Sequence, residues 1–533
     1  MSTRRRKFWG WGYEDQTLAE ADARKVARFV AGRTGTTPGA YRAPPRLEEI
    51  TLKAPRVAAP TSLKSVVSDT VYDRAAHSYG KSYPDYVRAF ARDFGNAPDL
   101  VAFPKTEADI AALLDWAGAT DIAVIPYGAG SSVVGGVEPV VGAAFKGTLS
   151  LDMAGLNKVR EIDTTSRAAR IEAGVYGPAL EAQLKSSGLT LRHFPQSFEF
   201  STLGGWIVTR SGGHFATLYT HIDELVENIR TITPNGVIES RRLPGSGAGP
   251  SPDRLIMGSE GALGIVTQAW VKLQEKPRHR ASRTYFFDDF LKAANGLRAV
   301  SQAGLYPANS RLVDAEECAL AGVGQGERHL VVLTFESGDH PVEPWMARAE
   351  ECLRDHGGVV AASIGAGARD ATADIWREAF IRAPFNREGI IACGLMHDTF
   401  ETSITWERLP DFHASVKSAT ERAIQDATGR PGHVTCRFTH LYPDGPAPYF
   451  TLHATPTPGR ELEQWRQIKT AASDALIRAG GTITHHHAVG RDHMPWYEKQ
   501  RPALFGAALA AAKQALDPKG ILNPGVLVPA RNR

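Results

Sequence analysis

The stretch Pro126-Tyr-Gly-Ala-Gly-Ser-Ser-Val-Val-Gly-Gly136 directly follows an apolar run, residues 122–125, that is typical of a buried β-strand. Its four glycines let the backbone approach a ligand closely, and successive N–H groups in such a turn form a nest that binds anions. Ser131 and Ser132 can add hydroxyl donors. The stretch therefore predicts a phosphate-binding turn, although taken alone it also fits an ordinary glycine-rich loop.

Two later segments have the same character: residues 196–213 (QSFEFSTLGGWIVTRSGG) and residues 257–267 (MGSEGALGIVT). Each sets Gly, Ser and Thr residues against an apolar run, so the three turns together indicate one long cofactor. No G-x-G-x-x-G helix start follows the strand before Pro126, which argues against a Rossmann domain. The order and spacing of the turns instead resemble the FAD-binding domain of the vanillyl-alcohol oxidase (PCMH-type) flavoproteins, in which FAD lies between two small α+β subdomains.

The composition is that of a folded protein with two or three domains, because 43% of the 533 residues are hydrophobic and 22% are charged. The 61 basic and 58 acidic residues nearly balance, which argues against nucleic acid as a partner. The four cysteines form no CxxC pair, so buried thiols in a reducing compartment are expected. No signal peptide or membrane span is recognisable, since the apolar stretch 502–516 is too short to cross a bilayer. We expect a cytoplasmic protein.

The expected fold class is α+β, with a two-subdomain PCMH-type FAD-binding domain and a substrate cap whose sheet is covered by helices. The expected regions are an N-terminal helical region (1–94), the FAD-binding domain (95–276), the cap (277–499) and a C-terminal segment that returns to the FAD-binding domain (500–533). Thr106 and Asp109 form a capping-box start for a helix, and Asn235-Gly236 predicts the tip of a hairpin. Helices are also expected at 18–30, 85–93 and 178–185, and cap strands at 330–335 and 449–453.

The cap contains three consecutive histidines, His485, His486 and His487. Imidazole titrates near neutral pH, so acid–base chemistry is the favoured interpretation. A metal site is less favoured, because neighbours in a strand point to opposite faces and only His485 and His487 could share an ion. A structural role for all three is a further alternative. We predict that no metal is bound.

Six motifs occur together in the order found in the alkyldihydroxyacetonephosphate synthase family, which the chain resembles over nearly its whole length. They are Trp9-Gly-Trp-Gly-Tyr, Glu199-Phe-Ser-Thr-Leu-Gly-Gly-Trp, Ile256-Met-Gly-Ser-Glu-Gly, Phe400-Glu-Thr-Ser, Thr435-Cys-Arg and the histidine run. Members of this family exchange the acyl chain of acyl-dihydroxyacetone phosphate for a fatty alcohol in ether-lipid synthesis, with no net oxidation or reduction. In the family's proposed mechanism, flavin N5 bonds to the carbon that carries the ester while the carboxylate leaves and the alcohol attacks.

The resemblance also implies the cofactor and the partners. FAD is expected to be non-covalent, because the first turn has no histidine of the kind that tethers flavin in other members of the superfamily. Lipid substrates are the expected partners. Peripheral membrane contact and a homodimer are further options.

Individual roles follow from the same resemblance. Tyr449 matches the family's catalytic tyrosine, the three histidines match its essential run, and His193 matches another active-site histidine. Arg387 matches the arginine that holds the substrate phosphate. Arg311 matches a further arginine needed for function, with an ion pair to Asp314 as an equal structural alternative. The implied cofactor-binding residues are Pro126, Tyr127, Gly128, Ala129, Gly130, Ser131, Ser132, Gln196, Ser197, Phe198, Glu199, Phe200, Ser201, Thr202, Thr209, Arg210, Ser211, Gly212, Glu260, Gly261, Ala262, Leu263, Gly264, Ile265 and Val266.

Two positions depart from the eukaryotic members of the family: Gln196 stands where they carry Asp, and Ala488 stands where they have Gly. A second interpretation is therefore an FAD-dependent dehydrogenase or oxidase of a 2-hydroxy acid on the same scaffold, with Arg387 binding the carboxylate. The generic flavin turns favour this interpretation. The triple histidine, Tyr449 and the N-terminal Trp-Gly motif favour the synthase, and a flavin-binding protein without catalysis is a third class.

Overall fold

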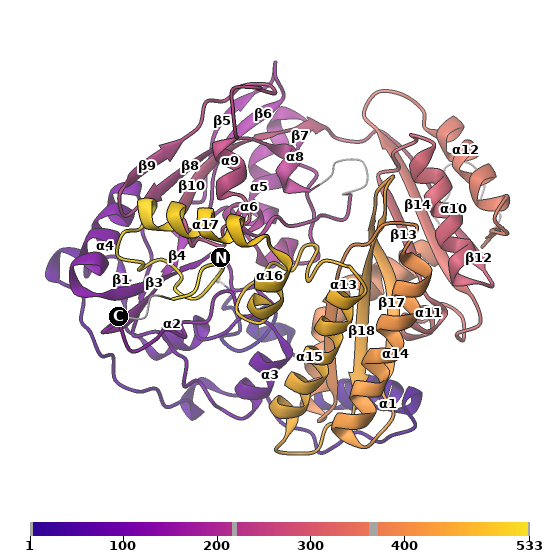
Figure 1. Cartoon of the computed structure of the whole chain (residues 1–533), viewed down its shortest axis with the longest axis horizontal. Coiled ribbons are helices and arrows are strands. Elements are labelled where there is room, and N and C mark those ends of the chain that lie inside the picture. Colours follow the sequence, from indigo (N-terminus) through magenta and orange to yellow (C-terminus); the bar gives the residue numbers. More distant parts are fainter. Residues whose placement is uncertain (1–3, 216–220, 362–370, 531–533) are drawn as a thin grey trace.

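The computed structural model describes residues 4–215, 221–361 and 371–530 (Figure 1). It confirms the α+β class, because sheets of four, five, two and seven strands are combined with helices throughout the described residues. The first three sheets build one half of the molecule, which we call the turn half. The seven-stranded sheet builds the other, which we call the cap half, and Figure 1 shows the two halves side by side.

The four-stranded sheet of the turn half delivers the first glycine-rich turn. Its order is β1-β2-β4-β3, in which β2, β3 and β4 are parallel and β1 is antiparallel. Helix α4 begins with the predicted capping box of Thr106 and Asp109 and buries Ile110 and Leu113 against the sheet. The bounds are β1 (Val67–Ser68), β2 (Leu100–Ala102), α4 (Glu107–Thr120), β3 (Ile122–Tyr127) and β4 (Gly147–Asp152). Because β3 ends at Tyr127, the turn begins where the strand stops.

The five-stranded sheet carries the second and third turns and has the order β5-β6-β10-β8-β9, antiparallel throughout. The predicted hairpin is formed by β8 and β9, with Asn235 between them. The bounds are β5 (Val159–Asp163), β6 (Ala168–Glu172), α5 (Gly177–Leu184), α6 (Leu203–Thr209), α8 (Ile222–Leu225), β8 (Val226–Thr233), β9 (Gly236–Glu239), α9 (Pro252–Ile256) and β10 (Ile265–Lys272). A small sheet of β7 (Leu189–Thr190) and β11 (Gln274–Glu275) completes this half.

The cap half is one antiparallel sheet of seven strands in the order β15-β12-β14-β13-β17-β18-β16. Its strands are β12 (His279–Phe287), β13 (Asn309–Val313), β14 (His329–Ser337), β15 (Val359–Val360), β16 (Met396–Glu401), β17 (His433–Leu441) and β18 (Pro446–Ala454). Its helices are α10 (Phe290–Gln302), α11 (Ala315–Leu320), α12 (Glu343–Arg354), α13 (Ala371–Ala392), α14 (Leu409–Thr428) and α15 (Glu461–Arg478). Apolar side chains of α10, α12, α14 and α15 pack with the strands in the main core, and Figure 1 shows these helices along the sheet.

The two ends of the chain join the halves. Residues 4–16 and helix α1 (Glu20–Arg33) pack against α13, while α2 (Val71–Ala76) and α3 (Tyr83–Phe90) lead into the first sheet. After α16 (Met494–Gln500) and α17 (Ala503–Leu516), the tail runs beside β3, where Val124 N–H donates to the Ile521 carbonyl at 2.8 Å. The single-turn helices are η1 (Glu14–Gln16), η2 (Leu47–Glu49), η3 (Thr61–Leu63), η4 (Met153–Gly155), η5 (Lys185–Ser187) and η6 (Phe198–Phe200).

Two further observations bear on the sequence-based expectations. All four cysteines are buried free thiols, as expected. Among the described helices, none is both long enough and apolar enough to span a membrane.

Candidate active site

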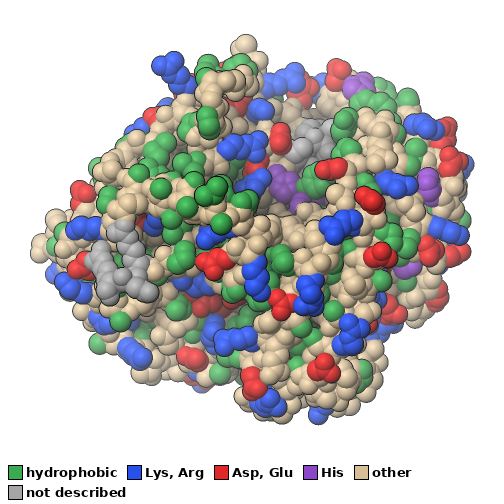
Figure 2. Space-filling view, viewed as in Figure 1, with side chains coloured by type: hydrophobic (Ala, Val, Ile, Leu, Met, Phe, Trp, Pro, Cys, Tyr) green, Lys and Arg blue, Asp and Glu red, His purple; other side chains and the backbone are tan. Residues whose placement is uncertain are grey.

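One cavity of about 430 Å³ lies between the glycine-rich turns and the cap sheet. All three turns contribute to its wall, and strands β13, β16, β17 and β18 form the opposite wall. Figure 2 shows histidine side chains gathered near the middle of one face, at the junction of the two halves. The predicted cofactor turns and most of the predicted catalytic residues therefore meet in one place.

The cap wall follows from the two-residue period of a β-strand. Thr435, Arg437 and Thr439 of β17 face the cavity, whereas Val434, Cys436 and Phe438 are in the core. On β18 the odd-numbered residues Tyr449, Thr451 and His453 face the cavity, and on β16 His397 and Thr399 do so. One face of the sheet is thus apolar and covered by helices, and the other is polar and faces the turns.

The turn wall is largely backbone. In the part of the chain that the structure describes, none of the backbone N–H groups from Ala129 to Val133 donates to another protein group. Gly130 has φ +70°, and a Cβ there would collide with the Tyr127 hydroxyl. A Cβ on Gly128 would likewise collide with the Thr202 hydroxyl. Free N–H donors in a turn that only glycine fits are what the pyrophosphate of FAD requires, so the turn fits this cofactor.

Not every predicted cofactor residue reaches the cavity. Those that line it are Pro126, Tyr127, Gly128, Ala129, Gly130, Ser131, Ser132, Gln196, Ser197, Ser201, Thr202, Thr209, Ser211, Gly212, Glu260, Gly261, Gly264, Ile265 and Val266. Arg210 instead turns to Asp223 (Nε to Oδ2, 2.7 Å), and Ala262 and Leu263 are buried at 1% exposure. Phe198 packs on Trp206, Phe200 packs on Trp11, and Glu199 is exposed. A turn has two sides, and the sequence does not say which one a side chain takes.

The triple histidine lies in a loop that one buried carboxylate holds. Glu401, at the end of β16, accepts the backbone N–H groups of His485 (2.8 Å), His486 (3.0 Å) and His487 (2.9 Å). The Thr484 hydroxyl donates to the same carboxylate at 2.6 Å. Burial opposes the charge of Glu401, but His486 and its neighbours hold the pKa of this carboxyl well below its ordinary value.

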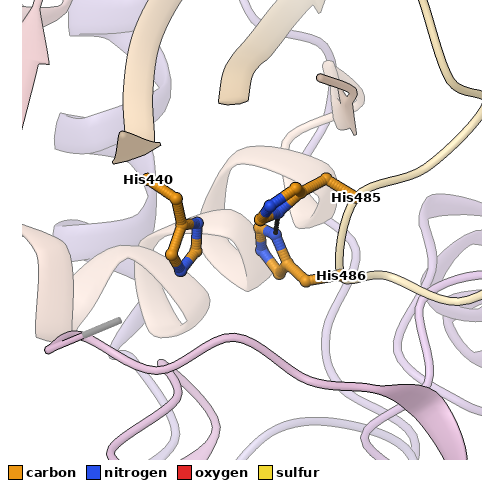
Figure 3. Close-up of side chains that lie close together, drawn as sticks. All are labelled: His440, His485 and His486. Atoms are coloured by element: carbon orange, nitrogen blue, oxygen red, sulfur yellow. Dashed lines mark hydrogen bonds between the residues drawn. The ribbon is translucent and has the colours of Figure 1, made fainter. Parts of the chain in front are cut away.

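The imidazoles form a cluster, and Figure 3 shows His485 and His486 side by side and facing His440. The Nδ1 of His485 lies 3.0 Å from His486 Nδ1, and its Nε2 lies 2.8 Å from the Tyr442 hydroxyl and 3.1 Å from His221 Nε2. His440, near the end of β17, packs beside both: its ring is tilted against that of His485 (centroids 4.8 Å apart) and edge-on to that of His486 (5.1 Å). Burial, reinforced by neighbouring imidazoles, holds the pKa of His440 and His485 well below the ordinary value. These two rings are therefore neutral at neutral pH.

The geometry corrects one step of the sequence argument on metals. The segment is not a strand, so consecutive His485 and His486 face each other, and their ring nitrogens lie within 4.8 Å of one in His440. Both nitrogens of His440 are engaged, Nε2 with the Gly213 carbonyl (3.2 Å) and Nδ1 with the Thr439 hydroxyl (3.0 Å). The absence of a bound metal stays a prediction.

Tyr449 lies at the centre of the cap wall. The Arg437 guanidinium carbon is 3.9 Å from the centroid of its ring, and His487 meets the ring edge-on at 5.3 Å between centroids. Burial raises the pKa of the Tyr449 phenol, while Arg437 acts in the opposite direction. The phenol is therefore protonated at neutral pH and available as a proton donor.

The two predicted substrate arginines are both held by the protein. Arg387 donates from Nη2 to Asp398 Oδ1 (2.9 Å), from Nη1 to the Lys81 carbonyl (3.1 Å) and from Nε to the His397 carbonyl (3.3 Å). It lines the cavity, although these bonds already engage all three of its nitrogens.

Arg311 is 2% exposed and also lines the cavity. It donates to Asn309 Oδ1 (3.1 Å) and lies 3.1 Å from His214 Nδ1, and burial lowers its pKa to about 9. Asp314, its proposed alternative partner, caps helix α11 through the Glu317 N–H and accepts the Cys436 N–H.

His193 lies behind the wall rather than in it. Its Nε2 is 2.8 Å from the Ser211 hydroxyl, and its ring packs at a tilt against Trp206 with centroids 5.1 Å apart. Burial lowers its pKa to about 3. His193 therefore supports the second turn from behind. His485 does not line the cavity either, and it contacts cavity residues such as His486 instead.

Sequence reasoning missed Glu401, His440, Arg437 and Lys81. Two of them lay within or beside quoted motifs, since Glu401 follows Phe400 and Arg437 follows Thr435-Cys. The acidic residue that ends the quoted Phe400-Glu pair, directly before two small hydroxyl residues, was the only local signal that could have pointed to Glu401. Nothing local marks His440 or Lys81, because their importance depends on neighbours distant in the sequence.

Two protein families match the chain, one over the turn half and the other over a range that includes the cap half. The FAD binding domain family matches residues 98–240, and the family described as FAD linked oxidases, C-terminal domain, matches residues 276–527. The alkyldihydroxyacetonephosphate synthase of Dictyostelium discoideum is 30% identical over 493 residues, which cover 88% of this chain and 79% of that protein.

The corresponding synthase of Trypanosoma brucei brucei is also 30% identical, over 86% of this chain and 78% of that protein. A solved structure of an alkyldihydroxyacetonephosphate synthase superposes with a TM-score of 0.80 at 25% identity, covering 97% of this chain and 98% of that chain. The likeness therefore extends through both halves.

Proposed function

Because the chain belongs to the alkyldihydroxyacetonephosphate synthase family and is an FAD-dependent enzyme of this type, we propose that it exchanges the acyl group of acyl-dihydroxyacetone phosphate for a fatty alcohol. The carbon–oxygen bond to the acyl group breaks, and a bond from the same carbon to the alcohol oxygen forms. The products are an alkyl ether and a free fatty acid, so no electron acceptor is needed.

The observation that carries this proposal is the shape of the cavity, which joins a cationic, imidazole-rich end to an apolar arm. The arm is lined by Val26, Phe29, Val30, Leu320, Ala321, Ala379, Ala383, Pro384 and Ile390. Phe29 is 49% exposed, so the arm reaches the surface beside α1. A phosphorylated ketone with an aliphatic chain matches both ends, whereas a small 2-hydroxy acid would leave the arm unfilled.

The head group would lie near Arg311, Arg437 and Arg387, which line the polar end. Guanidinium groups suit phosphate because they offer several donors in a fixed plane. Arg387 would have to exchange one of its present bonds for the phosphate, or act by holding the surrounding wall.

Proton handling would fall to the groups around Tyr449. His486 and His487 line the cavity, and we assign to them the proton beside the ketone. The protonated phenol of Tyr449 would then donate to the departing carboxylate. FAD, when bound at the glycine-rich turns, would supply an electrophilic N5 that keeps the substrate carbon in place while its two oxygen substituents are exchanged.

The lipid nature of both substrates also leads us to propose peripheral contact with a membrane at the mouth of the apolar arm. Phe29 there is accompanied by exposed Ile381 of α13, and α1 carries Arg24, Lys25 and Arg28. Apolar and basic side chains on one helix are typical of attachment to an anionic bilayer surface.

The test is an anaerobic incubation of the FAD-loaded protein with palmitoyl-dihydroxyacetone phosphate and isotope-labelled hexadecanol, without an electron acceptor. Label in an alkyl ether product is the expected result. Label absent from any ether, with the flavin spectrum unchanged by the acyl substrate, would reject the proposal.

A second candidate is oxidation of a 2-hydroxy acid, favoured by the match of the cap to the FAD linked oxidases and by neutral imidazoles at the cavity. It predicts that 2-hydroxy acids bleach the flavin and that an artificial electron acceptor restores its colour. The same protein sample therefore decides between the two candidates.

A further inference from the structure

A second, smaller cavity of about 130 Å³ lies on the other side of the first glycine-rich turn. Its walls include the turn itself, helix α2 and the N-terminal strap, by which we mean residues 4–16. Tyr127, Ala129 and Ser131 of the turn line both cavities. Lys81 also lines both, so its side chain lies at the partition between them.

The other charged groups around this cavity already have partners. Lys7 Nζ lies 2.6 Å from Glu388 Oε2, and Arg6 donates to the Tyr176 hydroxyl at 2.7 Å. Asp152 accepts the Ala154 N–H at 2.8 Å and lies 3.1 Å from His77 Nε2. Lys7 and His77 are therefore paired with carboxylates, whereas the hydrogen-bond partner of Arg6 is a neutral hydroxyl.

Lys81 differs from Lys7 because the hydrogen-bond partner of its ammonium group is neutral. Its Nζ donates to the Gly80 carbonyl at 3.1 Å, and in the described ranges no carboxylate oxygen lies within 4.0 Å of it. Burial lowers the pKa of Lys81 to about 8, although Asp85 partly offsets this, because the charge loses water without gaining a close counter-ion. An anion at this position would supply the missing partner.

Two backbone hydrogen bonds hold Lys81 in position. Its N–H donates to the Ser132 carbonyl at 2.6 Å, and its carbonyl accepts Arg387 Nη1 at 3.1 Å. Gly80 packs so closely on Ser132 that a Cβ there would collide with the Ser132 carbonyl. Lys81 is thus clamped between the first turn and the arginine of the cap wall.

We propose that Lys81 binds a phosphate oxyanion at the partition between the two cavities, beside the N–H donors of the first turn. An ammonium group is a compact charge that suits a phosphate oxygen approaching from one direction. The phosphate comes either from the pyrophosphate of FAD or from the substrate head group, and only the second source rests on the proposed function.

Binding measurements without turnover test the proposal and separate the sources. The variants are Lys81→Met, which keeps the length and removes the charge, and Lys81→Arg, which keeps the charge. Lys105→Met, at an exposed position, is the matched control. FAD and riboflavin are titrated into apoprotein by fluorescence, and sn-glycerol 3-phosphate is titrated into the FAD-loaded protein by its effect on the flavin spectrum.

If FAD supplies the phosphate, Lys81→Met weakens FAD binding at least about tenfold and leaves riboflavin binding unchanged. If the substrate supplies it, FAD binding is unchanged and glycerol 3-phosphate binding weakens at least about tenfold. Lys81→Arg restores most of the loss in either case. Apoprotein carrying Lys81→Met unfolds at the same temperature as wild type or higher, because a half-buried charge without a close counter-ion has been removed.

Two results would overturn the proposal. One is unchanged affinity for both FAD and glycerol 3-phosphate in a folded Lys81→Met protein. The other is a lower unfolding temperature of the Lys81→Met apoprotein with equal losses for FAD and riboflavin, which would make Lys81 a purely structural residue. Neither result depends on whether alkyl exchange is observed.

Discussion

The turn wall and the cap wall of the same cavity are made in opposite ways. The turn wall offers backbone N–H groups around glycines that leave no room for a Cβ, whereas the cap wall offers Tyr, His and Arg side chains from alternate positions of strands. A backbone wall suits a cofactor whose shape is constant, and a side-chain wall suits proton transfer. The difference implies that binding of FAD and turnover can be damaged separately.

Two buried carboxylates connect these walls through the segment 484–490. Glu401 of the cap accepts the N–H groups of the three histidines, and Glu260 of the third turn accepts those of Val489 (2.9 Å) and Gly490 (2.8 Å). Burial raises the pKa of Glu260 to about 7, while these two N–H donors act to lower it. The histidine loop is therefore held from both sides.

The largest effect is expected from Tyr449→Phe, which removes only the phenolic hydroxyl. We expect kcat to fall about 1000-fold, within the range that a general acid–base group contributes, with FAD content unchanged. Steady-state ether formation and the flavin absorbance measure the two quantities. Tyr306→Phe, at a 54% exposed position, is the control. Loss of FAD from the Tyr449→Phe protein would contradict the claim that the two walls serve FAD binding and turnover separately.

The next effect is expected from Glu401→Gln. The amide keeps one acceptor oxygen but presents an NH₂ group to the N–H groups of the histidine loop, so we expect kcat/KM to fall about 100-fold. FAD should stay bound, because Glu260 still holds the other end of the segment. Glu463→Gln, at a side chain that is 54% exposed, should change neither quantity. Full activity in the Glu401 variant would show that the loop needs no anchor.

A smaller effect, on FAD alone, is expected from Gly130→Ala. The residue has φ +70° and its new Cβ would meet the Tyr127 hydroxyl, so we expect the FAD dissociation constant to rise about 30-fold. At saturating FAD, kcat should stay within about threefold of wild type. Gly142→Ala, in the same connection but with no atom within 4 Å of the added Cβ, is the matched control. An equal loss of FAD affinity in both variants would mean that the effect comes from reduced backbone freedom in the connection and not from the collision with Tyr127.

The smallest effect concerns pH. The pKa of His193 is about 3 in the folded protein, below the ordinary value, so between these two pKa values the unfolded chain binds more protons. Stability conferred by neutral His193 is thus complete only well above about pH 6.5 and is lost on acidification, by about 1.4 kcal/mol at about pH 5.5. When the pH is lowered to about 5.5, the unfolding free energy of His193→Gln should therefore fall less than that of wild type, by the same amount. His340→Gln, at a side chain that is 47% exposed, is the matched control.

Much of the turn half was predictable from the sequence because its signals are local. The capping box at Thr106, the Asn235-Gly236 hairpin and the contact of Gly130 with Tyr127 each involve neighbours a few residues away, whereas Gly128 is restricted by the distant Thr202. The capping box and the hairpin were confirmed in position and type.

The cap wall could be predicted only in part, because its contacts are distant in the sequence. Strand period places Tyr449 and Arg437 on one face, but their register depends on pairing between β17 and β18. Glu401 reaches residues more than eighty positions away, and Arg387 is engaged by Lys81 from the other end of the chain. The histidines were expected on a strand, yet the N–H groups that Glu401 accepts fold them into a loop.

The most direct test of the central claim, that this cavity exchanges an acyl group for an alkyl group without net redox, is to follow the oxygen atom. Hexadecanol labelled with ¹⁸O is incubated anaerobically with the FAD-loaded protein and palmitoyl-dihydroxyacetone phosphate, and the products are analysed by mass spectrometry. We predict ¹⁸O in the ether and none in the released palmitate. Label in a palmitoyl ester, or no ether at all, would contradict the account.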